Sequence, residues 1–154
     1  MGIITTKTGD KGKTYLKDKL VSKGSLTIEV VGTIDELIAT MILTQSVTLL
    51  DRALFVDPIE KLIEINSYLT DFKKELELET IIMKMNQSIA SRQEYYTGFI
   101  YPYDDPKNAQ INVLRTVVRR TERTVIRLHE ESPLPEALLI FMNRLSDYIF
   151  VLIA

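Results

Sequence analysis

The stretch LRTVVRRTERTVIRL, residues 114–128, decides the fold class of this chain. Its apolar and small side chains recur at alternating spacings of four and three residues, at Leu114, Val118, Thr121, Val125 and Leu128. This spacing is close to the heptad of a coiled coil and places the five side chains along one face of a helix. We therefore expect a helix over about 109–131 that buries this face against other helices.

Two further helices are predicted from their start signals. Thr33 and Glu36 fit a capping box, so we expect a helix from Thr33 to about residue 50. Asp57-Pro58 fits an N-cap followed by the first helical position, and an apolar stripe continues from there to about residue 76. Two more segments, besides residues 114–128, are therefore predicted to be helical.

The remaining segments complete an all-α prediction. A helix is expected over about 78–95, and another, apolar nearly all round, runs from Pro135 to the C-terminus and suits burial at a bundle centre or subunit interface. Residues 96–108 read as a loop, and residues 1–32 as a loop arm with a short strand at 26–31. The sequence therefore predicts one domain over 1–154, with an arm (1–32) and a bundle of four or five helices (33–154).

Composition narrows the function. The length of 154 residues suits one domain, and the 45% hydrophobic and 26% charged content is globular. The absence of Cys excludes disulfides, thiolate metal sites and a cysteine nucleophile, and the one His excludes a two-histidine site. The net charge of −2 does not indicate nucleic acid as a partner. No apolar run reaches the ~18 residues of a membrane span and no secretory signal is present, so we expect a cytoplasmic protein.

Positive charge is concentrated in two segments. Residues 1–23 hold six of the eleven lysines, and residues 115–127 hold five of the eight arginines. In a chain of near-neutral net charge, such clusters either hold an anion or pair with the chain's own acids. Both interpretations stay open for both segments.

The lysine segment contains TKTGDKGKT, residues 6–14. Its glycines permit close backbone approach to a ligand, and its Lys and Thr side chains suit phosphate oxygens. Gly12-Lys13-Thr14 matches the second half of a P-loop, but the first glycine of that motif would fall on Lys7, and the flanking strand and helix are missing. We exclude a P-loop; a solvated terminus is the alternative to an anion-binding loop.

The arginine segment presents two adjacent helix faces. One carries Arg115 and Arg119 with Glu122 and Ile126, and the next carries Arg120, Arg123 and Arg127 with Thr116. Arginine suits bidentate contacts with phosphate. The alternative is a solvated face whose charge is balanced by the glutamates of the same helix.

Several isolated polar residues have structural explanations. Asn143 and Asp147 share one face of an apolar helix, where they either form a buried hydrogen-bond network, with an arginine of the 109–131 helix as the partner of Asp147, or contact a ligand. Asp35 lies in the first turn of its predicted helix, where a negative charge interacts favourably with the helix dipole. His129 lies near the end of its predicted helix, where a positive charge does the same. The aromatic cluster around the proline loop is either a core edge or a platform for a large flat ligand. Its members are Tyr95, Tyr96, Phe99, Tyr101 and Tyr103.

Four motifs resemble those of the PduO-type ATP:cob(I)alamin adenosyltransferase family. They are TKTGDKG at 6–12, VGTIDEL at 31–37, RTVVRRTER at 115–123 and NRLSDYIF at 143–150. They occur in the family's order and at compatible spacings along the whole chain. The resemblance implies a five-helix bundle that forms a homotrimer with active sites between subunits. It also implies transfer of the 5′-deoxyadenosyl group of ATP, accompanied by Mg²⁺, to the cobalt of a reduced corrinoid, with release of triphosphate.

The resemblance also assigns residues. For ATP it implies Thr6, Lys7, Thr8, Gly9, Thr14, Tyr15 and Lys23 from one subunit, and Arg119, Arg120, Glu122, Arg123 and Asn143 from the next. Asp35 and Arg115 match an ion pair beneath the corrin, and Phe99 matches an aromatic that displaces the lower cobalt ligand. Catalysis would therefore rest on Arg119, Asp35, Arg115 and Phe99, with no protein nucleophile. No residues are assigned to the metal.

The sequence also departs from the family pattern. Pro102-Tyr103-Asp104-Asp105 replaces the usual Pro-Gly-Gly, and residues 23–26 replace the usual Asp-Pro-Arg before the first helix. The sequence ends at Ala154, where relatives usually continue, so we expect no tail over the corrinoid. The alternative function is a non-catalytic carrier or sensor that binds ATP and corrinoid. A reductase partner is expected for the enzyme, and neither nucleic acid nor membrane.

Overall fold

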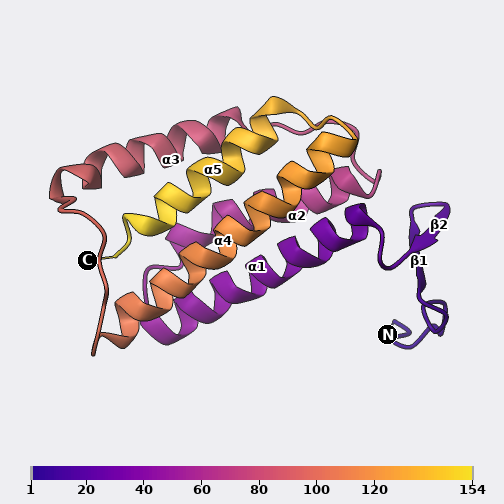
Figure 1. Ribbon diagram of the computed structural model, residues 1–154, viewed down its shortest axis with the longest axis horizontal. Helices are drawn as coiled ribbons and strands as arrows, with labels where there is room; N and C mark the ends of the chain where they lie inside the picture. The colour runs from indigo at the N-terminus through magenta and orange to yellow at the C-terminus, as the bar shows by residue number, and fades with distance from the viewer. Residues whose placement is uncertain (1, 154) are drawn as a thin grey trace.

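The computed structural model describes residues 2–153 and contains a helical bundle with a small hairpin at one end (Figure 1). The helices are α1 (Leu26–Thr48), α2 (Ala53–Leu69), α3 (Glu79–Arg92), α4 (Pro106–Glu131) and α5 (Glu136–Phe150). Helix α4 packs between α1 and α5, while α2 packs against α1 and α3 against α5. The predicted all-α class is confirmed.

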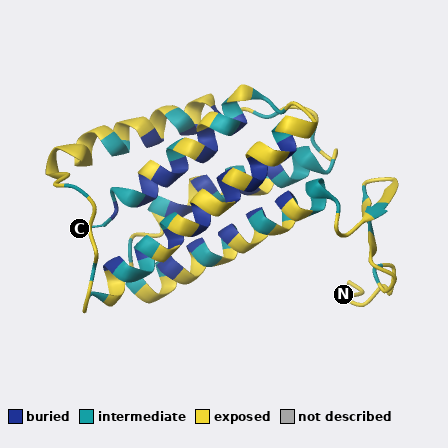
Figure 2. Ribbon diagram, viewed as in Figure 1, coloured by how far each residue is buried: buried dark blue, intermediate teal, exposed yellow. Residues whose placement is uncertain are grey.

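The core lies along the inner faces of the helices (Figure 2). Helix α4 contributes the stripe that the sequence predicted, since Leu114, Val118, Thr121, Val125 and Leu128 are all buried. It begins three residues before the predicted start, because Asp105 caps it: the Asp105 carboxylate accepts from Asn108 N at 3.1 Å and from Asn108 Nδ2 at 2.7 Å. The heptad spacing therefore placed α4 in the bundle correctly.

The predicted start of α1 is wrong. The helix begins at Leu26, and Ser25 is its N-cap, with Ser25 Oγ accepting from Ile28 N at 3.4 Å. Thr33 lies inside the helix, where Thr33 Oγ1 donates to Glu29 O at 2.7 Å instead of capping. The expected loop and strand over 26–31 are helical because Val30 packs into the core, and tertiary packing outweighs the weak helix propensity of β-branched residues.

Helix α2 starts earlier than predicted and contains Pro58 in its interior. Pro58 has no N–H to donate to the carbonyl of Leu54, four residues before it. Tyr148 of α5 supplies the missing donor, because its hydroxyl donates to Leu54 O at 2.6 Å. The Asp57-Pro58 pair is therefore not a helix start, and the freed carbonyl joins α2 to α5.

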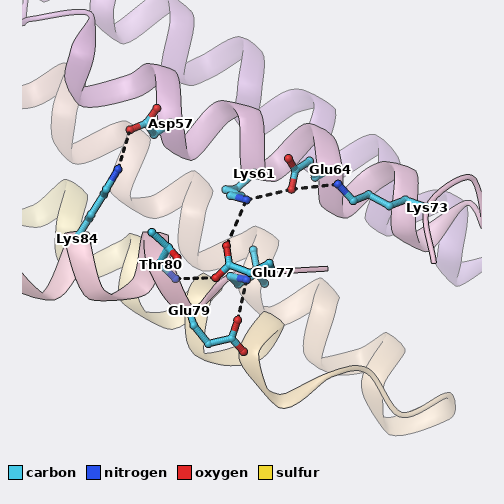
Figure 3. Close-up of polar contacts among 9 residues, drawn as sticks. Asp57, Lys61, Glu64, Lys73, Glu77, Glu79, Thr80 and Lys84 are labelled. Atoms are coloured by element: carbon cyan, nitrogen blue, oxygen red, sulfur yellow. Dashed lines mark hydrogen bonds and ion pairs between the residues drawn. The ribbon is translucent and has the colours of Figure 1, made fainter. Parts of the chain in front are cut away.

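Ion pairs between exposed or half-buried side chains join α2, α3 and the segment between them (Figure 3). Lys61 Nζ lies 3.2 Å from Glu64 and 3.8 Å from Glu77, and Lys84 Nζ lies 3.8 Å from Asp57. Glu77 also caps α3, since Glu77 Oε1 accepts from Thr80 N at 2.8 Å, and this hydrogen bond lowers the pKa of Glu77. The predicted helix over about 78–95 corresponds to α3 and the short 3-10 helix Gln93–Tyr95 that follows it.

The arm contains a hairpin that the sequence analysis missed. Strands β1 (Lys13–Leu16) and β2 (Lys19–Ser22) pair antiparallel, with Lys13 opposite Ser22 and Leu16 opposite Lys19. The two-residue turn places Lys17 at φ 56°, which is unusual for a residue with a side chain. Because residues 26–32 belong to α1, the arm in the structure comprises residues 2–24. No hydrogen bond or ion pair joins these residues to a helix, and the hairpin projects from one end of the bundle (Figure 1).

Candidate functional site

A cavity of about 620 Å³ lies where α3, α4 and α5 meet the aromatic loop. It collects three of the four residues predicted for catalysis: Phe99, Arg115 and Arg119. Arg144 and Asp147 of α5 contribute to the same wall. The cavity therefore combines positive charge, one carboxylate and aromatic surface, and we call it the main cavity.

Aromatic rings form one side of the main cavity. Phe99 is 77% exposed, and its ring centroid lies 6.5 Å from that of Phe150 in an edge-to-face arrangement. Tyr96 contacts the same Phe150 ring at 5.6 Å. Such a ring cluster offers a flat ligand an apolar surface that nothing in the described chain covers. Phe150 had no predicted role, although it ends the NRLSDYIF motif and is the motif's last aromatic residue.

The two α4 arginines of the main cavity are held by partners on their own helix. Arg119 lies 2.7 Å from Glu122, whose carboxylate is buried, and Arg115 Nε donates to Asn112 Oδ1 at 2.9 Å. A buried carboxylate next to a half-exposed guanidinium fixes the direction of that guanidinium. Glu122, predicted as an ATP contact, therefore also orients Arg119.

Of the two interpretations of Asn143 and Asp147, the buried network is wrong. Both residues are exposed in this chain, and no ion pair within residues 2–153 joins Asp147 to an arginine of α4. Their face of α5 is turned away from the core, which is formed by neighbours such as Leu145 and Ser146. The neighbouring Arg144 has a buried Nε with no hydrogen-bond partner among the described residues, so the wall of the main cavity carries an unused donor.

The second arginine face of α4 forms a separate hollow of about 470 Å³. Arg120, Arg123 and Arg127 line it together with Thr124. Arg120 pairs with Glu36, and Arg127 Nη2 lies 3.0 Å from Glu29 on α1. Arg123 has no ion pair in the part of the chain that the structure describes, which leaves its charge available to an anion.

The arm gathers the residues of the other predicted ATP group. Lys23 N donates to Gly12 O at 2.9 Å, which closes the segment between them. The Lys23 side chain lies against Gly9, where an added Cβ would meet Lys23 Nζ at 2.6 Å. The prediction that Lys23 belongs with the loop is consistent with this position, and Gly9 leaves room for its ammonium group. Thr6, Lys7 and Thr8 lie on the loop, and Thr14 and Tyr15 on β1.

The predicted pair of Asp35 and Arg115 is not formed within this chain. Asp35 is exposed on α1, and the described residues include no ion pair for either side chain. The arm also lies at the opposite end of the bundle from the aromatic loop that lines the main cavity (Figure 1). A single chain thus holds the predicted site residues as separate groups: the main cavity with exposed Asn143 nearby on α5, the α4 hollow, the arm, and Asp35.

One further residue singled out by the sequence, His129, has a structural role. His129 Nδ1 accepts from Leu134 N at 2.9 Å, so this histidine ties the end of α4 to the following turn. No group of three or more His, Cys, Asp or Glu residues suited to a metal ion occurs within residues 2–153. No helix in the same range combines the length and apolar content needed to cross a bilayer.

A five-helix bundle with an arginine- and aromatic-lined cavity suits proteins that bind a flat ligand together with an anion. Within that class, this chain belongs to the cobalamin adenosyltransferase family, whose sequence model matches residues 4–154. The chain is 33% identical over 160 residues to a corrinoid adenosyltransferase of Bacillus subtilis, covering 96% of this chain and 82% of that protein. It is 32% identical to a cobalamin adenosyltransferase of Cupriavidus metallidurans, covering 97% and 85%.

Solved structures agree with this assignment. A variant PduO-type ATP:co(I)rrinoid adenosyltransferase from Lactobacillus reuteri, complexed with ATP, superposes with a TM-score of 0.75 at 28% identity, covering 97% of this chain and 91% of that one. A second variant of that enzyme, complexed with cobalamin and ATP, gives a TM-score of 0.75 at 26% identity, with the same coverage. The recognised family and the predicted fold are therefore confirmed.

Proposed function

We propose that this chain transfers the 5′-deoxyadenosyl group of ATP to the cobalt of cob(I)alamin or a related corrinoid and releases triphosphate. The observation that chiefly supports this function is the main cavity, which is lined by Phe99, Arg115 and Arg119 in a chain of the cobalamin adenosyltransferase family. Its relatives' solved structures hold ATP and cobalamin. The predicted site residues supply the parts that this reaction requires.

The reaction needs alignment and charge stabilisation more than a protein nucleophile. Cobalt(I) attacks the 5′ carbon with its electron pair, a cobalt–carbon bond forms, and the carbon–oxygen bond breaks with its electrons on the departing triphosphate. The cavity residues hold the corrinoid so that cobalt faces the ribose carbon. Arg119, Arg120 and Arg123, with Lys7 and Lys23 of an arm, stabilise the charge that develops on the leaving group. Asn143 and the hydroxyl-bearing residues of the arm would add hydrogen bonds to ATP.

Magnesium is proposed to enter with ATP. The described residues offer no cluster of carboxylates or histidines that would hold the ion by themselves. Phosphate oxygens and water are its usual ligands in nucleotide sites, where few protein ligands are needed. The chain's own contribution is to bind the phosphates with arginine and lysine.

We further propose that the complete site lies between copies of residues 1–154, acting as one domain in a homotrimer. Three observations support this assembly. Residues 2–24 of the arm form no hydrogen bond or ion pair with the helices, the arm lies at the opposite end of the bundle from the aromatic loop, and Asp35 has no ion pair within the described chain. An arm from one copy would meet α4 of the next, and Asp35 of one copy would meet Arg115 of another. We place the protein in the cytoplasm, with a reductase as the supplier of cobalt(I).

An anaerobic adenosylation assay tests the function. Purified protein is mixed with ATP, Mg²⁺ and chemically reduced cob(I)alamin, and adenosylcobalamin is followed by its spectrum. The control is Arg52→Ala, which removes an exposed arginine just before α2. Loss of product in Arg119→Ala but not in Arg52→Ala would support the adenosyltransferase function. Binding of ATP and corrinoid without product would instead support a carrier or sensor. Binding of neither would contradict both functions.

A further inference from the structure

A second cavity, of about 490 Å³, lies directly behind the aromatic wall of the main cavity. Tyr96, Phe150 and Val151 line both cavities, so the two share a wall. The second cavity continues between the end of α3 and the loop that carries Phe99, and we call it the rear cavity. No residue predicted for ATP or corrinoid lines it.

The lining of the rear cavity combines aromatic surface with one positive charge. Tyr95, Tyr96 and Ile100 line it beside Phe150, and Tyr95 is 76% exposed. Arg92 is the only lining residue with a formal charge, and it makes no ion pair or hydrogen bond within residues 2–153. Against the larger effect of burial, the charge of Arg92 also lowers the pKa of the Tyr148 hydroxyl, and Asp57 raises it. This lining suits a flat aromatic group that carries a single negative charge.

We propose that the rear cavity binds the nucleotide tail of a complete corrinoid, with the base among the tyrosines and the phosphodiester on Arg92. This inference rests on the proposed function. When Phe99 takes the place of the lower ligand, the base leaves cobalt but stays tethered to the corrin ring. A cavity that shares a wall with the site is within reach of that tether. Its volume falls in the range of small-molecule sites, about 300–1,000 Å³.

The arrangement gives the tail a function in selecting the corrinoid state. A base that is stacked on Tyr95 and Tyr96 is removed from competition for cobalt, so the form without a lower ligand is stabilised. Because a conformational equilibrium shifts only by differential binding, the contribution of Arg92 must vanish for a corrinoid that has no tail. Cobinamide, which lacks the nucleotide, is therefore the matched probe.

The experiment compares the binding of cob(II)alamin and cob(II)inamide, in the presence of ATP and Mg²⁺, to the full chain and two variants. Arg92→Gln should weaken cob(II)alamin binding about tenfold, the effect of losing one charge-assisted hydrogen bond, and leave cob(II)inamide binding unchanged. Tyr95→Ala should show the same selectivity; this side chain is largely exposed, so folding should be unaffected. Arg52→Gln, which removes an exposed arginine elsewhere, should change neither affinity.

Equal losses for both corrinoids, no loss for cob(II)alamin, or a wild-type chain that binds both equally would overturn the inference. Adenosylation of cob(I)inamide separates this result from the proposed function. A chain that adenosylates cob(I)inamide but shows no tail-dependent effect of Arg92→Gln retains the enzyme function without the tail site. A chain that adenosylates neither corrinoid contradicts the proposed function itself.

Discussion

Glu122 is the one charged residue that the fold buries among residues 2–153, with an exposed fraction of 7%. Burying a carboxylate is unfavourable unless a cation compensates it, and Arg119 does so at 2.7 Å. The guanidinium itself remains half exposed beside the main cavity. The buried carboxylate thus fixes the position of the Arg119 guanidinium at the main cavity.

Glu122→Gln should therefore slow adenosylation about tenfold or more, because the amide keeps the shape but not the charge that holds Arg119. The measurement is kcat/KM for ATP with chemically reduced cob(I)alamin. Glu130→Gln, a change on the same helix outside the cavities, serves as the control and should be neutral. A Glu122→Gln rate within about twofold of wild type would show that Arg119 is positioned by something else.

Phe99 should matter more for making cobalt(I) than for using it. Removing the lower axial ligand raises the reduction potential of cobalt, and an exposed apolar ring at the cavity can displace that ligand. Phe99→Ala should impair the reaction from cobalt(II) far more than the reaction from chemically reduced cobalt(I). Tyr103→Ala, an exposed aromatic of the same loop that does not line the cavity, is the control. Equal losses in the two assays would exclude this role for Phe99.

At the scale of the helices, Pro58 and Tyr148 form a unit that packs α2 on α5. The proline leaves Leu54 O without its helical donor, and the tyrosine hydroxyl replaces that donor at 2.6 Å. Tyr148→Phe should lower the free energy of unfolding by about 1–3 kcal/mol, because it leaves the carbonyl unpaired.

The same substitution in a Pro58→Ala background should cost less, because an alanine at this position can supply the helical N–H. Urea unfolding of the wild type, both single variants and the double variant measures this coupling. An equal cost of Tyr148→Phe in both backgrounds would mean that the proline does not create the need for the tyrosine.

Helix existence was predictable from the sequence, whereas some helix starts were not. The α4 stripe at Leu114, Val118 and Val125 has the period of a helix. This period identifies the helix whichever elements pack against it. Thr33 and Glu36 match a cap by local chemistry, yet Ser25 is the real cap because burial of Val30 extends α1 backwards. The hairpin in the arm has strands of four residues, too short for a clear alternation.

For the whole molecule, the burial of Tyr148 predicts a loss of stability in alkali. Burial raises the pKa of the Tyr148 hydroxyl, Arg92 opposes that rise, and Asp57 adds to it. An unfolded tyrosine titrates near pH 10, so above about that pH the unfolded chain releases a proton that the folded chain retains. The free energy of unfolding then falls as pH rises.

Tyr148→Phe should remove part of this slope. Chemical unfolding at pH values between about 9 and 11 would show a flatter decline for the variant than for the wild type. The variant should be less stable below this range, and the two curves should converge as pH increases. Parallel curves would contradict the assignment of the slope to this hydroxyl.

The proposed assembly predicts complementation between defective chains. Lys23→Ala removes a cation of the arm, and Arg123→Ala removes the unpaired cation of the α4 hollow. If sites lie between copies, randomly mixed trimers should regain about a quarter of the wild-type activity, because about one site in four combines an intact arm with an intact α4. Co-expression followed by activity and native mass measurements tests this. Mixed trimers without regained activity would place the whole site in one chain.

The site was predictable as a list of residues but not as an arrangement. The four motifs named most of the cations, and the main cavity brings Arg115, Arg119 and Phe99 together as that list suggests. The contributions of Phe150 and of the buried Arg144 Nε depend on packing against other elements, which the sequence of α5 does not specify. The predicted burial of Asn143 and Asp147 failed because α5 was treated as apolar nearly all round, whereas both residues lie on an exposed face opposite buried positions such as Leu138 and Leu145.

The hairpin arm is folded on itself and is held by no hydrogen bond or ion pair to the helices of its own chain, as far as residues 2–153 show. Under the proposed assembly, the affinity for ATP then depends on the concentration of the protein, because only assembled subunits have a complete site. Dilution below the dissociation constant of the assembly would leave each monomer with its main cavity. The monomer would no longer have the lysines of a neighbouring arm to bind the phosphates of ATP. By mass action, ATP would in turn hold the subunits together, so that a cell's nucleotide supply would help to set how much of the protein is assembled.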